Sequence, residues 1–102
     1  MASRDNFHQL LVDVLGSRNV YFQPPESIRM NYPCIKYDKD NNWTLHADDS
    51  KFIGKSRYTV TLIDYDPDSD EFNSKLNEIP YSSLDRTYTA DNLNHFVYTI
   101  YF

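Results

Sequence analysis

The stretch Arg57-Tyr58-Thr59-Val60-Thr61-Leu62-Ile63-Asp64-Tyr65 is the strongest β-strand candidate in the chain. β-Branched and aromatic side chains fit the pleated surface of a sheet, and they make up most of this stretch. Tyr58, Val60 and Leu62 alternate with Arg57, Thr59 and Thr61, which is the two-residue period of a strand. The sequence therefore predicts a strand at 57–65 with one apolar face on the core.

A second long strand is predicted at 95–102, after a shorter strand at 85–90 and a connection at 90–94. Its apolar face is formed by alternate residues, Phe96, Tyr98, Ile100 and Phe102. Val97 and Tyr101 make the opposite face half apolar. We expect a strand that is covered on both faces to lie inside a sheet or at a contact between subunits.

An amphipathic helix is predicted before these strands, at 3–15. Its apolar stripe follows the helical period and consists of Phe7, Leu10, Leu11, Val14 and Leu15. Ser3 is a suitable N-cap, and Asp5 suits the positive end of the helix dipole. Gly16 stands where a glycine commonly ends a helix.

A second helix is predicted after the strand at 57–65. Phe72, Leu76 and Ile79 form its apolar stripe, and Pro80 ends it. Asp66 or Ser69 can cap it, with Pro67 in the first turn and acidic residues at its positive end.

The remaining elements are shorter. Residues 19–23 and 32–37 are predicted strands, separated by Pro24-Pro25, and residues 38–42 are a predicted turn. Residues 43–46 are either a short strand or an extended loop. The 102 residues provide room for one domain, which we place at 1–102. The predicted fold class is α+β: a mostly antiparallel β-sheet of four to six strands, with an N-terminal helix and a second helix packed on it.

The composition excludes several function classes. The formal net charge is −5, and the basic residues are scattered, so we expect no general phosphate-binding surface for nucleic acid. The longest apolar run is far shorter than the ~20 residues of a membrane helix, so no membrane role is expected. Nine Tyr, six Phe and one Trp raise the aromatic share to 16%, which favours core and protein-interface contacts.

Motifs for chemistry are weak. The acidic run from Asp64 to Glu71 resembles a calcium loop, but the sixth position is Ser69 and the twelfth is Lys75 where the loop needs Gly and Glu. An acid-tipped helix explains the same residues.

The three histidines, His8, His46 and His95, lack metal-ligand spacing, and one cysteine, Cys34, excludes an internal disulfide. No nucleophile elbow, phosphate loop or dinucleotide fingerprint is present. We therefore expect neither an enzyme nor a cofactor, metal or catalytic residue.

The order of elements and several local stretches resemble the tail-terminator and tail-completion (neck) proteins of long-tailed bacteriophages. The resemblance covers the whole chain and rests on pattern. The stretches that carry it are Asn-Val-Tyr-Phe-Gln-Pro-Pro (19–25), Tyr-Pro-Cys-Ile-Lys-Tyr (32–37), Arg-Tyr-Thr-Val-Thr-Leu-Ile-Asp (57–64) and Asp-Asn-Leu-Asn-His-Phe-Val-Tyr-Thr-Ile-Tyr-Phe (91–102).

This resemblance implies a structural virion protein rather than an enzyme. Members of the family form a ring, typically a hexamer, at the head-proximal end of the tail tube. The ring stops polymerisation of the tube, presents a surface for head-tail joining and lets double-stranded DNA pass without specific binding. The implied partners are copies of the chain, the tail-tube protein and the head-tail connector. The implied location is the virion tail or neck, after assembly in the host cytoplasm.

A closed ring needs two different adhesive patches on each subunit. The candidate residues for contacts with a subunit or the tube are aromatic or apolar: Trp43, Phe52, Val97, Tyr101 and Phe102. Residues 43–55 are a candidate loop that becomes ordered on a neighbour. Two alternatives stay open: a head-closure or head-tail adaptor protein of the phage neck, and a monomeric binding domain or small hydrolase.

Overall fold

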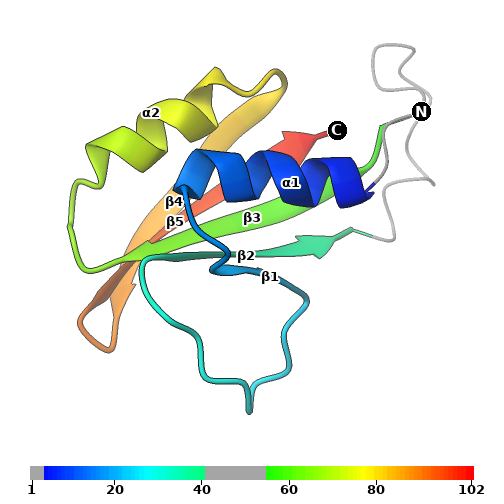
Figure 1. The fold of residues 1–102 in the computed structure, drawn as a ribbon. Helices are drawn as coiled ribbons and strands as arrows, with labels where there is room; N and C mark the ends of the chain where they lie inside the picture. Colours follow the sequence, from blue (N-terminus) through cyan, green and yellow to red (C-terminus); the bar gives the residue numbers. More distant parts are fainter. Residues whose placement is uncertain (1–3, 41–54) are drawn as a thin grey trace.

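The computed structural model describes residues 4–40 and 55–102, which contain two helices and one five-stranded sheet. The elements follow one another along the chain as shown by colour in Figure 1. They are α1 (Arg4–Leu15), β1 (Val20–Phe22), β2 (Cys34–Lys39), β3 (Arg57–Asp64), α2 (Asp70–Glu78), β4 (Ser82–Ala90) and β5 (Leu93–Tyr101). This arrangement confirms the predicted α+β class.

The strands lie side by side in the order β1-β2-β3-β5-β4. All neighbouring pairs are antiparallel except β1 and β2, which are parallel, so the sheet is mixed. β3 lies at the centre of the sheet, where Val60 pairs with Tyr98 and Leu62 with Phe96 of β5. β5 thus lies between β3 and β4, which agrees with the interior position expected for a strand covered on both faces.

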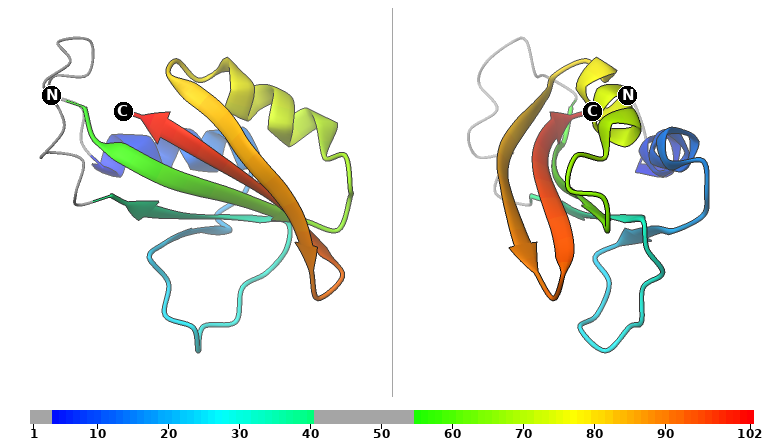
Figure 2. Two further views of the ribbon diagram at one scale, coloured as in Figure 1. Left: turned by 180° about the vertical axis from the view of Figure 1, so that it is seen from behind. Right: turned by 90° about the vertical axis from the view of Figure 1, so that its left-hand side faces the viewer.

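Both helices cover the same face of the sheet, and the core lies between the helices and the strands (Figure 2). Aromatic rings fill the part of the core under α1. Phe7 stacks on Tyr58 with ring centroids 4.4 Å apart and meets the ring of Tyr37 edge-on at 5.6 Å. The rest of the core is mainly aliphatic and includes Leu11, Ile35, Val60, Leu62, Leu76 and Ile100, none of which is exposed.

The end of α1 agrees with the prediction. Gly16 has a φ of +73°, and its amide donates a hydrogen bond of 2.8 Å to the carbonyl oxygen of Val12. This left-handed position closes the helix, as expected for a glycine just beyond a C-terminus. The proposed cap, Ser3, lies outside the described residues.

The start of α2 corrects the prediction. Pro67 precedes the helix instead of lying in its first turn, because α2 begins at Asp70. Ser69 takes the N-cap position but makes no side-chain cap bond. Its hydroxyl donates to Oδ2 of the buried Asp64 at 2.7 Å. Leaving a buried carboxylate without hydrogen-bond donors costs more free energy than leaving the helix end without a cap. Water can form hydrogen bonds with the exposed amides of the first helical turn.

Three strand boundaries also differ from the prediction. β2 continues through Asp38 and Lys39, which the sequence placed in a turn, because both residues pair with β3. β4 begins at Ser82 instead of 85. The β4–β5 connection is a two-residue turn, Asp91-Asn92, and both residues have a positive φ. The possible strand at 43–46 lies outside the described residues.

Candidate functional site

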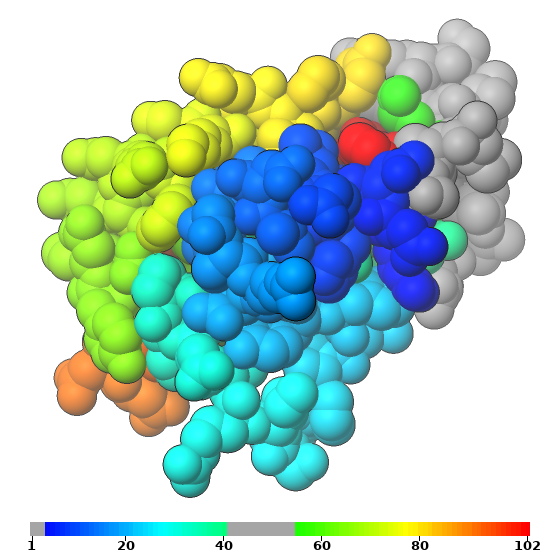
Figure 3. All heavy atoms as spheres, viewed as in Figure 1, coloured from blue at the N-terminus to red at the C-terminus, as the bar shows by residue number. Residues whose placement is uncertain are grey.

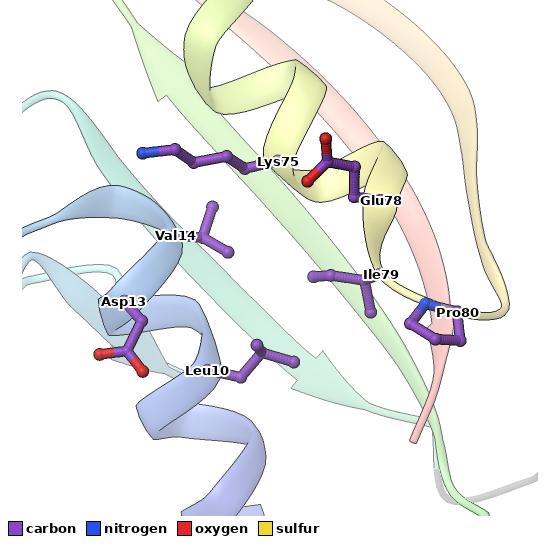
Figure 4. Close-up of a pocket in the computed structure, with 7 residues that line it drawn as sticks. All are labelled: Leu10, Asp13, Val14, Lys75, Glu78, Ile79 and Pro80. Carbon is purple, nitrogen blue, oxygen red and sulfur yellow. The ribbon is translucent and has the colours of Figure 1, made fainter.

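The helices α1 and α2 lie next to each other on one face of the molecule (Figure 3). An apolar groove lies between them (Figure 4). Its volume is about 320 Å³. The groove is lined by residues of α1 and by the end of α2, namely Leu10, Asp13, Val14, Lys75, Glu78, Ile79 and Pro80. We call it the inter-helix groove.

The groove is apolar because apolar residues of α1 and of the end of α2 face each other at this place. Leu10 and Val14 lie four residues apart on α1 and therefore share a face. Ile79 follows the last residue of α2, where Pro80 prevents a further helical turn. In Figure 4 the side chains of Leu10, Val14 and Ile79 point toward the space between the helices.

Charged side chains border this apolar floor. The amine of Lys75 lies 3.3 Å from Oε1 of Glu71, an exposed ion pair within one turn of α2. Asp13 accepts a hydrogen bond of 3.0 Å from the amide of Gln9. Glu78 is exposed, and within residues 4–40 and 55–102 it forms no ion pair.

The groove continues toward the end of β5. An adjoining pocket of about 190 Å³ shares Leu10, Ile79 and Pro80 with it. Its other lining residues are Lys55, Tyr81, Tyr101 and Phe102. The amine of Lys55 lies 5.1 Å from the centre of the Tyr81 ring, which places a cation beside an aromatic surface at this end.

The structure brings together two of the residues that the sequence proposed for contacts. Tyr101 and Phe102 line the far end of the groove, and both are half-buried. The ring of Phe102 also lies 5.0 Å from Phe7, and its backbone pairs with Ser56 in both directions. Phe102 therefore supports the fold as well as the groove.

The other residues predicted to make contacts do not line the groove with Tyr101 and Phe102. Val97 pairs with Thr61 on one side and Arg86 on the other, and only 6% of its surface is exposed. Its neighbours in the same subunit already cover it, so little of Val97 is available to a partner. Trp43 and Phe52 lie outside the described residues, as does the rest of 43–54.

A second surface is the outer edge of β4. Every residue of β4 after Ser82 is exposed, and in the described part of the chain no strand pairs with this edge. Leu84 and Tyr88 are 46% and 43% exposed, which is unusual for large apolar side chains on a long strand. Such an edge presents unpaired backbone groups that another chain can pair with.

Sequence reasoning missed the inter-helix groove and the β4 edge. The stretch Ile79-Pro80-Tyr81 was a signal for the groove, because it places apolar residues directly after a helix end. The alternation of apolar and polar residues in β4 was too weak to show that this strand lies at an edge of the sheet.

Two side chains that could carry chemistry, Cys34 and His8, are engaged within the fold. Burial raises the pKa of the Cys34 thiol to about 12, which keeps it protonated and unreactive at neutral pH. The ring nitrogen Nδ1 of His8 lies 2.7 Å from the hydroxyl of Tyr37, so the two share a hydrogen bond. Among the residues that the structure describes, no three His, Cys, Asp or Glu side chains are grouped as metal ligands. Nor does this part of the chain contain a helix long and apolar enough to cross a bilayer.

The chain was compared with family models, with curated proteins and with solved structures, and nothing in any of the three matches it.

Proposed function

We propose that this chain is a structural virion protein that forms a ring at the head-proximal end of a phage tail tube. There it ends polymerisation of the tube and provides the surface for head-tail joining. The observation that carries the proposal is the presence of two unlike surfaces on separate elements: the inter-helix groove with its apolar lining, and the free edge of β4, where Leu84 and Tyr88 are exposed on opposite faces of the sheet.

Unlike surfaces are what a ring requires. When subunits join head to tail, a patch on one subunit meets a different patch on the next, and the ring closes if the rotation allows it. A symmetric dimer would instead need one patch that fits itself. Exposed apolar side chains on separate elements, as found here, support the head-to-tail arrangement.

The charge supports passage of DNA. A hexamer would carry a formal charge of about −30, since each subunit carries −5. Three exposed acids, Asp66, Asp68 and Asp70, lie along the β3–α2 connection and at the first residue of α2. A negative lumen repels phosphates, so DNA would slide through such a ring instead of binding to it.

The direct test is electron microscopy of the purified protein, alone and mixed with tail tubes. We expect closed rings and a single ring at one end of each tube. Deleting the gene from the phage should give overlong tails or tails without heads. Tails of normal length that still join heads would overturn the proposal.

A head-closure or adaptor role in the neck is the alternative within the virion. Co-purification with the tube protein on one side, or with the portal-side connector on the other, separates the two roles. If the chain co-purifies with the connector and not with the tube protein, the adaptor role is correct and the terminator role is wrong.

A further inference from the structure

We propose that the tip of the β1–β2 loop of one subunit inserts into the inter-helix groove of the next, with Ile28 as the side chain that enters. We call residues 25–29 the loop tip. The proposed function is needed only for the step in which such contacts close into a ring. The partner that occupies the groove is a second copy of this chain.

The loop tip is built to present Ile28. The amide of Ile28 donates a hydrogen bond of 3.1 Å to the carbonyl oxygen of Pro25, which closes a turn. The base of the loop is held by the amide of Asn31, which donates to the hydroxyl of Tyr21 at 3.1 Å. Ile28 is nevertheless 41% exposed. A preorganised loop loses little freedom on binding, so an exposed apolar residue at its tip is suited to a contact.

The inter-helix groove matches such a side chain in polarity. Leu10 and Pro80 are the more accessible apolar residues of its lining, since Val14 and Ile79 are each only 7% exposed. The groove volume of about 320 Å³ leaves room for a branched aliphatic side chain and the turn that carries it. Apolar contact surfaces of this kind are favoured in the central, water-free part of a protein interface.

The charges beside Ile28 complement those beside the groove. Glu26 and Arg29 flank Ile28, both are exposed, and neither forms an ion pair within residues 4–40 and 55–102. The groove carries Lys75 and Glu78 on its α2 side. Both pairs hold a basic and an acidic residue three positions apart. In the orientation that brings opposite charges together, Arg29 faces Glu78, and Glu26 approaches Lys75, whose amine already lies 3.3 Å from Oε1 of Glu71.

The loop tip and the groove lie in different parts of the subunit. The β1–β2 loop projects beyond the sheet, away from α2, in every view (Figures 1 and 2). In the space-filling view its atoms protrude from one side of the molecule, while α1 and α2 lie together above them (Figure 3). The loop tip of one copy therefore meets the groove of another copy, which makes the contact head to tail.

The free edge of β4 is a poorer occupant of the groove. An exposed strand edge binds through its row of backbone groups, which pair with another strand. The groove is lined by side chains of two helices and offers no such row. The β4 edge is therefore left for a different partner.

The first experiment measures self-association of the purified full chain by sedimentation, with Ile28→Asp as the variant. We expect roughly 30-fold weaker self-association or more, as for a central interface residue. Ile28 lies outside the core, so the circular dichroism and the melting temperature should stay as in the wild type. The matched control is Asn92→Asp, which adds the same negative charge in the exposed β4–β5 turn, away from the loop tip, and should not weaken association.

The second experiment tests the orientation by charge exchange. Arg29→Glu and Glu78→Arg should each weaken association, because each places like charges together. The double variant should recover most of the lost affinity, since it restores an opposite pair in reversed order. A general loss of solubility or stability would not produce this recovery.

Three results would overturn the inference: association unchanged by Ile28→Asp, association lost in Leu84→Lys but not in Ile28→Asp, or a wild-type chain that is monomeric at every concentration. The second result would assign the contact to the β4 edge. If rings respond to Ile28→Asp while the deletion phage has normal tails, the proposed function fails and the contact stands. If rings ignore Ile28→Asp while tails are overlong, the contact fails and the function stands.

Discussion

Ser69 shows how one side chain fixes a connection in this fold. Its backbone has a φ of +45°, its hydroxyl donates to Asp64, and only 3% of its surface is exposed. Asp64 also accepts a hydrogen bond of 3.3 Å from the amide of Asp66. The carboxylate at the end of β3 thus organises the chain that leads into α2.

Ser69→Ala should lower the free energy of unfolding by about 1–2 kcal/mol, because it leaves an oxygen of a buried carboxylate without its donor. The expected fall in melting temperature is roughly 4–8 °C per kcal/mol for a chain of this size. Differential scanning calorimetry provides the measurement. Ser83→Ala is the control, since Ser83 makes a 3.4 Å bond on an exposed strand. Equal melting temperatures for the two variants would contradict the role of Ser69.

The tyrosines replace aliphatic residues in the core because their hydroxyl groups find partners. Tyr37 and Tyr98 are fully buried. The hydroxyl of Tyr37 meets His8, and that of Tyr98 donates to Asn73 of α2. Among the described residues, no buried side-chain nitrogen or oxygen lacks a hydrogen-bond partner. Part of the high aromatic share of the sequence is thus used in the core.

Among the elements, α1 depends on a single glycine for its end. A Cβ added to Gly16 would meet no atom within 4 Å, so a larger residue would not clash there. The φ of +73° is the obstacle, because side chains other than glycine disfavour the left-handed region.

Gly16→Ala should therefore lower the free energy of unfolding by about 1 kcal/mol through the backbone alone. Gly16→Asn should cost less, because asparagine tolerates left-handed backbone better than alanine. Urea unfolding of the three proteins measures both values. If alanine were as stable as glycine, the helix end would not depend on this conformation.

The two edges of the sheet differ in length. β1 has three residues, whereas β4 has nine and is exposed along nearly its whole length. The β4–β5 register shifts between Leu84 and Arg86, so the edge strand carries a bulge. Bulges bend an edge and limit indiscriminate pairing. The edge of β4 can thus still pair with a partner whose shape fits the bend.

For the whole molecule, the buried tyrosines and Cys34 predict sensitivity to alkali. Burial raises the pKa of Cys34 from 9.0 to about 12 and raises the pKa values of Tyr37, Tyr58 and Tyr98 above the usual 10.0. The unfolded chain loses these protons at lower pH than the folded chain does. Above pH 9 it binds fewer protons, so the free energy of unfolding falls as the pH rises.

Melting temperatures measured from pH 8 to pH 11 should accordingly decline, beginning near pH 9 and more steeply above pH 10. Cys34→Ala should remove the part of the decline between pH 9 and 10, whatever its effect on stability at pH 8. A melting temperature independent of pH up to 11 would contradict the burial of these groups.

Assembly is the other property of the whole molecule. Tyr101→Asp should impair self-association far more than Lys39→Ala, because a charge would lie at an apolar groove, at a cost of a few kcal/mol. Sedimentation gives the comparison, and ring formation unchanged by Tyr101→Asp would remove the end of β5 from the contact. Deletion of Phe102 is a poorer test, since its ring packs on Phe7 in the core.

Local patterns were sufficient for much of the fold. The strands predicted at 57–65 and 95–102 correspond to β3 and β5. They, both helices and the α+β class follow from the spacing of apolar residues, because that period reflects which side of each element faces the core. The role of Gly16 at the end of α1 could also be predicted, because its left-handed conformation depends only on its own backbone. The boundaries of β2 and β4 could not, because they depend on the partner strand.

The inter-helix groove could not be located from local sequence, although the stretch Ile79-Pro80-Tyr81 marked one part of its lining. Leu10, Ile79 and Tyr101 belong to three parts of the chain, and they meet because both helices settle on one face of the sheet. Exposure elsewhere in the sheet also depends on position: Val97 of the inner strand β5 is 6% exposed, whereas Leu84 of the edge strand β4 is 46% exposed. Periodicity in the chain thus established which residues turn inward. Which surfaces stay open to a neighbour was established by how the elements pack, because exposure depends on what lies opposite each side chain in space.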